Sequence, residues 1–191
     1  MIEFTIYDIK IRLRFDFFAA AAFMNALSDP EISVCALLCC ILHELGHIAA
    51  MLAVGAKPRS VLFYGAGIMI APDRHKLLPV SSEAVVLSAG CAVNFLLFLL
   101  SAMAGSRFAL FGAVNLFIGA FNLLPAAGLD GGRLLGLFLE EHFSQRTASA
   151  VSRAAGCVSA VLLCGIMAFI GVENLTVIIA AAFMMISSLM V

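Results

Sequence analysis

The chain has 191 residues, of which 63% are hydrophobic and 12% are charged, and its formal net charge is −1. A soluble domain carries roughly 25% charged residues, so this composition predicts an integral membrane protein embedded in the lipid bilayer. The chain contains no basic or acidic block, and we therefore expect no nucleic-acid partner.

The N-terminal residues 2–15 alternate between apolar and mostly charged side chains, as in Ile9 to Arg14. This period of two predicts a strand or extended segment at the membrane surface. Because charged residues occur among the first sixteen positions, we expect no cleavable signal sequence of the usual form. The apolar run Phe17–Leu27 follows, and its helix can begin as early as Phe15. It is short for a bilayer that needs about 20 residues, so we expect a thin first span.

A strong helix-start signal follows at Ser28–Glu31, with Ser28 as the expected cap and Pro30 in the first turn. The apolar sequence then predicts a helix to about Val54, where Gly55 can end it. At 1.5 Å per residue such a helix covers roughly 36 Å, which is enough to cross a membrane with some tilt.

This helix contains the pattern His-Glu-x-x-His, formed by His43, Glu44 and His47. Two imidazoles four residues apart share one helical face and can bind one zinc ion. Glu44 is then placed to take a proton from the water that the metal activates and to return it later, as in metallopeptidases. Ionisable groups in the middle of an apolar span are costly and therefore indicate a functional site. The structural alternative is a polar cluster that holds neighbouring helices together.

Between residues 57 and 79, two β-like runs flank a Gly-Ala-Gly turn, which predicts a hairpin at the cytoplasmic membrane interface. An edge strand around Val61 to Ile70 could hold an extended substrate segment by strand addition. The residues expected to do so are Val61, Leu62, Phe63, Tyr64 and Gly65.

Further spans are predicted at about 81–104, 108–124, 148–170 and 175–191. Pro125 ends the fourth, and the glycine-rich segment after it predicts a break before helix resumes from Arg133 to about Phe143. Irregular backbone at membrane depth is tolerated where protein buries it or where it lines a wet cavity. The predicted fold is therefore an all-α membrane protein of about six transmembrane helices, the fourth one broken, with a short strand or hairpin element. We expect one polytopic domain over residues 1–191, with a catalytic core at about 15–143 and C-terminal helices at about 148–191.

Basic residues predict the orientation of these spans. With six spans and the N-terminus inside, ten of the eleven Lys and Arg residues fall on the inside and one, Arg107, on the outside. This is a strong positive-inside bias, so we expect an integral cell-membrane protein with cytoplasmic N- and C-termini. The inside set is Lys10, Arg12, Arg14, Lys57, Arg59, Arg74, Lys76, Arg133, Arg146 and Arg153.

A catalytic zinc needs a third protein ligand and an open position for water. Asp130 is the best candidate, because it lies within the predicted break of the fourth segment, on the same predicted side as the two histidines. Its alternative role is a cap for the helix that resumes at Arg133. A membrane zincin that uses a downstream glutamate, Glu83 or Glu140, is a second possibility for the third ligand.

The His-Glu-x-x-His pattern together with the segment Phe121–Arg133, which reads FNLLPAAGLDGGR, resembles the paired signatures of the site-2 protease family of intramembrane zinc metalloproteases. The resemblance implies that His43, His47 and Asp130 bind one Zn²⁺ per chain and that Glu44 is the catalytic base. Segment Ser88–Asn94 is similar to a further family element, although Cys91 stands where proline is usual. Asn94 and Asn122 are therefore expected to support the metal site or to position substrate.

The expected activity is hydrolysis of a peptide bond in or near a transmembrane segment of a membrane-protein substrate, near the cytoplasmic side, as in regulated intramembrane proteolysis. A membrane regulatory protein is a further possible partner. The chain shows neither the PDZ nor the CBS domain of many relatives, and this small form is most like the branch that processes a sporulation sigma-factor precursor. The rival functions are a zinc or divalent-metal transporter, which should carry more ligand residues along its spans, and a non-catalytic scaffold.

Overall fold

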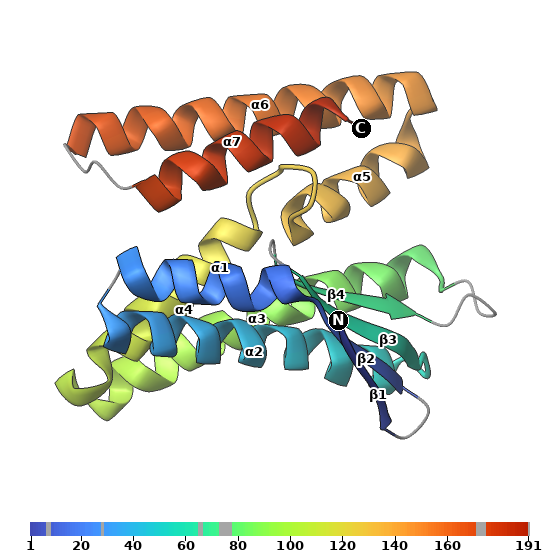
Figure 1. Ribbon diagram of the computed structural model, residues 1–191. Helices are drawn as coiled ribbons and strands as arrows, with labels where there is room; N and C mark the ends of the chain where they lie inside the picture. The colour runs from blue at the N-terminus through green and yellow to red at the C-terminus, as the bar shows by residue number, and fades with distance from the viewer. Residues whose placement is uncertain (7–8, 28, 65–66, 73–77, 171–174, 191) are drawn as a thin grey trace. The chain divides into compact units, whose positions relative to one another are not determined.

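The computed structural model describes residues 1–6, 9–27, 29–64, 67–72, 78–170 and 175–190 (Figure 1). The described chain forms two compact units, Met1–Gly119 and Ala120–Val191. The expected division into a core at about 15–143 and C-terminal helices is untested and stays a prediction.

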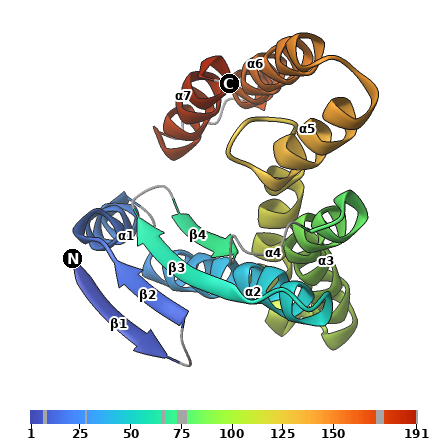
Figure 2. The same ribbon diagram turned by 90° about the vertical axis from the view of Figure 1, so that its right-hand side faces the viewer.

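A four-stranded sheet in the order β1-β2-β3-β4 belongs to the first unit (Figure 2). Its strands are β1 (Ile2–Ile6), β2 (Ile9–Leu13), β3 (Pro58–Tyr64) and β4 (Gly67–Pro72). Neighbours pair antiparallel except β2 and β3, which are parallel. The alternation of residues 2–15 thus contains two paired strands rather than one segment. The register places Glu3 opposite Arg12, and their side chains form an ion pair of 3.0 Å across the ladder.

Two helices connect the parallel strands: α1 (Phe15–Leu27) and α2 (Pro30–Ala53). The cap of α2 is Asp29, whose carboxylate accepts a hydrogen bond of 3.0 Å from the backbone N–H of Glu31. Pro30 is the first helical residue, where its missing N–H removes no helical bond. The expected cap, Ser28, lies outside the described residues. Gly55 has a positive φ of 73° just after α2, as expected for a helix end.

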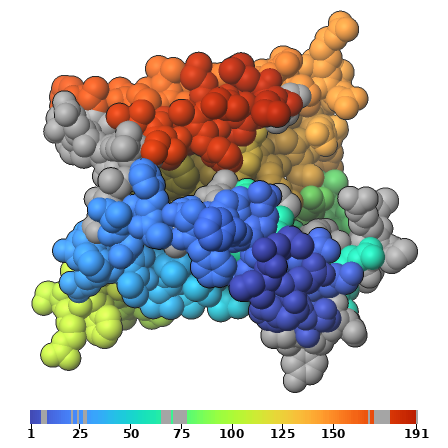
Figure 3. Space-filling model, viewed as in Figure 1, coloured from blue at the N-terminus to red at the C-terminus, as the bar shows by residue number. Residues whose placement is uncertain are grey.

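The helices that follow are α3 (Val80–Ala104), the short 3-10 turn η1 (Ser106–Phe108) and α4 (Ala109–Asn122). Helix α3 packs along α2, and this pair forms the framework for the histidines. Apolar side chains remain on the outside of the first unit, as on α1, whose residues Phe15, Phe18 and Phe23 are exposed (blue in Figure 3). Such a surface fits a lipid environment, in which apolar groups need not be buried inside the protein.

The second unit contains α5 (Asp130–His142), α6 (Gln145–Ile170) and α7 (Leu175–Leu189), and α6 and α7 pack side by side (Figures 1 and 2). A buried apolar cluster holds its parts together. The cluster consists of Ala126, Leu129, Ala160 and Met184, with Phe121, Leu124 and Leu163 packed against it.

The glycine-rich segment differs from the sequence prediction. Helix α5 begins at Asp130 rather than at Arg133, so Gly131 and Gly132 are helical. A Cβ at Gly131 would collide with the backbone of Leu123, and one at Gly132 with the backbone of Ala126. These glycines therefore permit close approach of the preceding loop to the helix, rather than breaking the helix.

The described residues contain three helices that are long and apolar enough to cross a membrane, namely Pro30–Ala53, Val80–Ala104 and Gln145–Ile166. A shorter apolar helix covers Ile178–Leu189. The mostly helical membrane fold with a small sheet is thus confirmed at this coarser level.

Candidate metal centre

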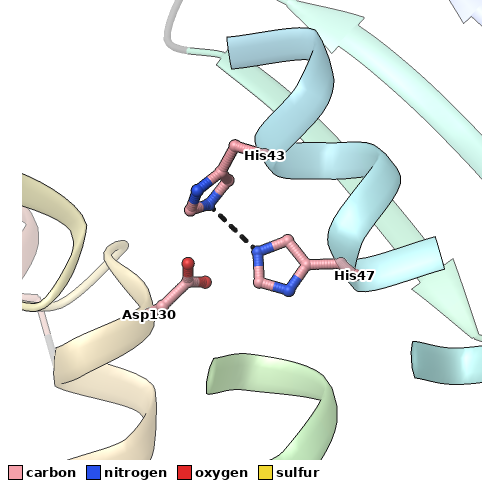
Figure 4. Close-up of side chains that lie close together, drawn as sticks. All are labelled: His43, His47 and Asp130. Carbon is pink, nitrogen blue, oxygen red and sulfur yellow. Dashed lines mark hydrogen bonds between the residues drawn. The ribbon is translucent and has the colours of Figure 1, made fainter. Parts of the chain in front are cut away.

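The two histidines of α2 face one another. His43 and His47 are one helical turn apart, and both are buried, with 4% and 7% of their surfaces exposed. Their Nε2 atoms lie 3.1 Å apart, as the dashed line in Figure 4 marks. The rings meet nearly edge to face, with centroids 4.7 Å apart. The helical spacing therefore produces a convergent pair of imidazole nitrogens inside an apolar helix.

The other nitrogen of each ring is held by α3. His43 Nδ1 lies 2.6 Å from Asn94 Oδ1, and His47 Nδ1 lies 2.7 Å from the backbone carbonyl of Val86. A carbonyl oxygen accepts hydrogen bonds and never donates one. Both rings therefore carry a proton on Nδ1, and in the neutral form of each ring Nε2 presents a lone pair.

In that form neither nitrogen can donate to the other, and a bound cation relieves the repulsion between the two lone pairs. Zinc binds imidazole nitrogen at about 2.0–2.1 Å, and two such ligands in a tetrahedral site lie about 3.3 Å apart. The observed separation of 3.1 Å is close to this value. A metal-binding histidine almost always donates its second N–H to a carboxylate, a carbonyl or water. The donor chemistry of His43 and His47 therefore fits a zinc ion.

Small residues make room for this pair. A Cβ at Gly46 of α2 would lie 2.9 Å from the backbone oxygen of Ala89 in α3, so the two helices approach closely there. On the facing side, a Cβ at Gly90 would collide with His47 Nε2 and would lie 2.7 Å from His43 Nε2. Close approach at small residues is typical of helix packing in membranes. Gly90 keeps open the space beside both Nε2 atoms.

The remaining signature residues occupy defined places in their own units. Glu44 is half-buried on α2, next to His43. Asp130 is the first helical residue of α5 and is buried, with 9% of its surface exposed, and it is the third side chain labelled in Figure 4. The cap of α5 is Leu129, so Asp130 is not the capping residue. A carboxylate in the first turn of a helix is favoured by the helix dipole. Asn122 is the last residue of α4.

The glutamates weighed as alternative ligands lie elsewhere on their helices. Glu83 is in the first turn of α3, and Glu140 is exposed near the end of α5.

The expected substrate strand is an internal strand. Residues Val61 to Tyr64 belong to β3, which pairs with β2 on one side and with β4 on the other. Its backbone groups are therefore already used in the sheet. Among the described strands, β4 and β1 are the edges. The sequence predicted an edge strand around Val61–Ile70, and within this range the strand at the edge of the sheet is β4. Gly65 lies outside the described residues.

Sequence reasoning placed Asn94 near the site but missed Asn115 and Gly90. Asn115 is fully buried on α4 and accepts a hydrogen bond of 2.8 Å from Asn94 Nδ2. An asparagine within an apolar span is itself a sign of a specific partner. The identity of that partner depends on the packing of α3 against α4, which no local pattern reveals.

Comparison with known proteins gives a consistent picture. The family model for peptidase family M50 matches residues 101–166. A solved structure, the site-2 protease from Methanocaldococcus jannaschii, is similar with a TM-score of 0.71 at 22% identity, covering 99% of this chain and 94% of that one. This likeness supports the fold.

Three curated proteins are also similar. A Synechocystis protein provisionally named a zinc metalloprotease is 32% identical over 105 residues, which is 50% of this chain and 27% of that protein. A zinc metalloprotease of Methanocaldococcus jannaschii is 26% identical over 61% of this chain and 36% of its own length. Stage IV sporulation protein FB of Bacillus subtilis is 28% identical over 70% of this chain and 49% of its own length. The matches thus span about a quarter to a half of these relatives, and they confirm the resemblance to the site-2 protease family.

Proposed function

We propose that this chain is an intramembrane zinc metalloprotease of the site-2 protease type, which hydrolyses a peptide bond in or near a transmembrane segment of a membrane-protein substrate. The observation that carries the proposal is the buried pair of Nε2 atoms 3.1 Å apart, each ring oriented through its Nδ1, with Glu44 next along the helix. The similarity to proteins named zinc metalloproteases supports the same function.

The proposed ligands of one zinc ion per chain are His43, His47 and Asp130. Two imidazoles and one carboxylate form a typical catalytic donor set, which leaves a position for water. Bound zinc supplies Lewis-acid polarisation of the scissile carbonyl and lowers the pKa of water to about 7. Glu44 takes the proton of the attacking water and delivers it to the leaving amine, which is the role of a general base and then a general acid. Asn94 accepts a hydrogen bond from His43 Nδ1 and so orients the ring, and Asn122 supports the metal site or positions substrate.

The proposed membrane arrangement has about six spans, a fourth span interrupted between α4 and α5, and both termini in the cytoplasm. Basic residues concentrated in the segments assigned to the inside support this orientation. Cleavage then takes place near the cytoplasmic side. The similarity to stage IV sporulation protein FB supports the branch that processes a membrane-bound precursor in regulated proteolysis, with a membrane protein as a possible regulator.

The substrate segment must be unwound before hydrolysis, because the carbonyls of an intact helix are hydrogen-bonded and shielded. We place its extended form on the edge strand β4, where backbone hydrogen bonds can replace those of the helix. Residues Val61 to Tyr64 then support this edge from the neighbouring strand β3 rather than bind substrate backbone directly. Of these residues, Val61 is buried and pairs with Ile70.

The test compares wild type with Glu44→Gln in liposomes that contain a panel of single-span membrane proteins with cytoplasmic tags. We expect a shortened product from wild type, and Glu44→Gln should retain its zinc while cleavage falls about 10²–10⁴-fold. Glu141→Gln, which changes an exposed carboxylate on α5, is the matched control and should cleave normally. Undiminished cleavage by Glu44→Gln, or zinc movement into the liposomes without any cleavage by wild type, would overturn the proposal.

A further inference from the structure

A chain of buried hydrogen bonds leads from the backbone of α4 to His43. Asn115 Nδ2 donates to the backbone oxygen of Phe111 at 2.9 Å, and Asn115 Oδ1 accepts from Asn94 Nδ2 at 2.8 Å. Asn94 Oδ1 in turn accepts from His43 Nδ1 at 2.6 Å. Both asparagines have 0% of their surface exposed, so water does not compete for these bonds.

The donor and the acceptor of every hydrogen bond in this series are determined by its first bond, from Asn115 to the Phe111 oxygen. The Phe111 oxygen can only accept, so the amide group of Asn115 must turn its Nδ2 toward it and its Oδ1 toward Asn94. An Oδ1 in that place obliges Asn94 to present Nδ2, which leaves the Oδ1 of Asn94 for His43. A ring nitrogen facing an amide oxygen must carry the proton.

We propose that Asn115 is a positioning residue for the metal centre: by fixing the amide orientation of Asn94, it fixes the tautomer in which His43 Nε2 presents its lone pair to a metal. The proposal rests on zinc binding by His43 in the proposed function. If Asn94 turned over, its Nδ2 would face His43 Nδ1. The ring proton would then move to Nε2, and a protonated nitrogen cannot bind a metal.

A second contact strengthens this assignment. Asn115 Nδ2 also donates to Cys39 Sγ at 3.1 Å, and Cys39 lies one helical turn before His43 on α2. Asn115 therefore uses both hydrogens of its amide nitrogen, and its oxygen is the group that meets Asn94. Turning this amide over would place its oxygen against the Phe111 carbonyl, where no hydrogen bond can form. Of the two asparagine side chains between Phe111 and His43, Asn115 therefore has the more strongly determined amide orientation.

The test uses Asn115→Leu and Asn115→Asp, which separate the accepting role of the side chain from its packing. Leucine has a similar size but cannot accept from Asn94. Aspartic acid, which burial favours in its neutral form, keeps a carbonyl oxygen for Asn94. The first readout is ¹⁵N NMR of the imidazoles in metal-free protein, because the two neutral tautomers differ in which nitrogen bears hydrogen. The chain has four histidines, and His47, held by a backbone carbonyl, is the internal reference.

We expect wild type and Asn115→Asp to show His43 with hydrogen on Nδ1, and Asn115→Leu to show a mixture that includes hydrogen on Nε2. Zinc affinity, measured by competition with a chelator, should fall about 10–100-fold in Asn115→Leu, the usual effect of losing a partner that orients a ligand. Adding Asn94→Asp to Asn115→Leu should restore affinity, because either oxygen of that carboxyl can accept from His43. Ser101→Ala, which removes another buried polar group of α3, is the control and should change neither readout.

An unchanged His43 tautomer in folded Asn115→Leu would overturn the proposal. Equal losses of zinc affinity in Asn115→Leu and Asn115→Asp, with no restoration by Asn94→Asp, would overturn it as well and would indicate a packing role. Wild-type protein could also show the expected tautomers but bind no zinc. That result would refute the metal centre of the proposed function, whereas the hydrogen-bond series from Asn115 to His43 would remain supported.

Discussion

Substitution of Gly90 by alanine tests the space beside the two imidazoles. The new Cβ would lie 2.7 Å from His43 Nε2, whereas ordinary contact begins at 3.4 Å. The nitrogen would have to move by about 0.7 Å, and metal-ligand distances tolerate only about 0.2 Å. Neither ring can turn aside without losing its Nδ1 hydrogen bond to Asn94 or to Val86.

We therefore expect Gly90→Ala to lose zinc and to reduce cleavage by about 10²-fold or more, since a displacement near 1 Å can cost that much in rate. Alanine in a helix is more favourable than glycine by about 0.5–1 kcal/mol, so the helix itself should remain stable. The assays are zinc content per chain, cleavage of a tagged substrate in liposomes, and thermal unfolding.

Gly165→Ala provides the matched control on α6. A Cβ there has no heavy atom within 4 Å, so this variant should retain zinc and activity. If Gly90→Ala bound zinc with wild-type affinity and cleaved substrate at the wild-type rate, the assignment of that space to the metal would be refuted.

Two further predictions concern the third ligand and the sheet edge. Asp130→Ala should lose zinc while Glu83→Ala and Glu140→Ala retain it; loss of zinc in a glutamate variant instead would favour the zincin with a downstream glutamate. Proline at Ile68 and at Met69 tests β4 as the substrate strand, because successive backbone N–H groups of a strand point to opposite sides. One variant should stop cleavage with zinc and stability intact, whereas the other should lose a hydrogen bond to β3 and unfold more readily. Normal cleavage by both folded proteins would count against strand addition.

The local part of the metal centre could be predicted from sequence because it depends on a single helix. Residues four apart on a helix share a face wherever that helix packs, so His43 and His47 were expected to converge, and they do. The helix boundaries near Phe15 and Ala53 followed in the same way from capping and apolar length. These features require no knowledge of a neighbouring segment.

Features that depend on distant segments could not be predicted in this way. Alternation of apolar side chains indicates extended backbone wherever it occurs, so the pattern of residues 2–15 did not reveal that it contains two strands, β1 and β2, that pair with one another. Gly131 and Gly132 resembled a helix break, because glycine lowers helix propensity, yet their role is to admit the backbone of Leu123 and Ala126. The link from Asn94 to Asn115 joins positions 21 residues apart on different helices.

The parallel pairing of β2 with β3 closes a long loop of chain from Ile9 to Tyr64, and this loop contains helices α1 and α2. Loss of the pairing between β1 and β2 therefore weakens the strand to which β3 is hydrogen-bonded. Strand β3 directly follows α2, the helix that carries the two imidazoles. Closing a loop of this length is slow compared with forming the helices themselves, because its two ends are far apart in the sequence. The histidine pair of α2 should consequently reach its final environment late in folding, after β3 has paired with β2.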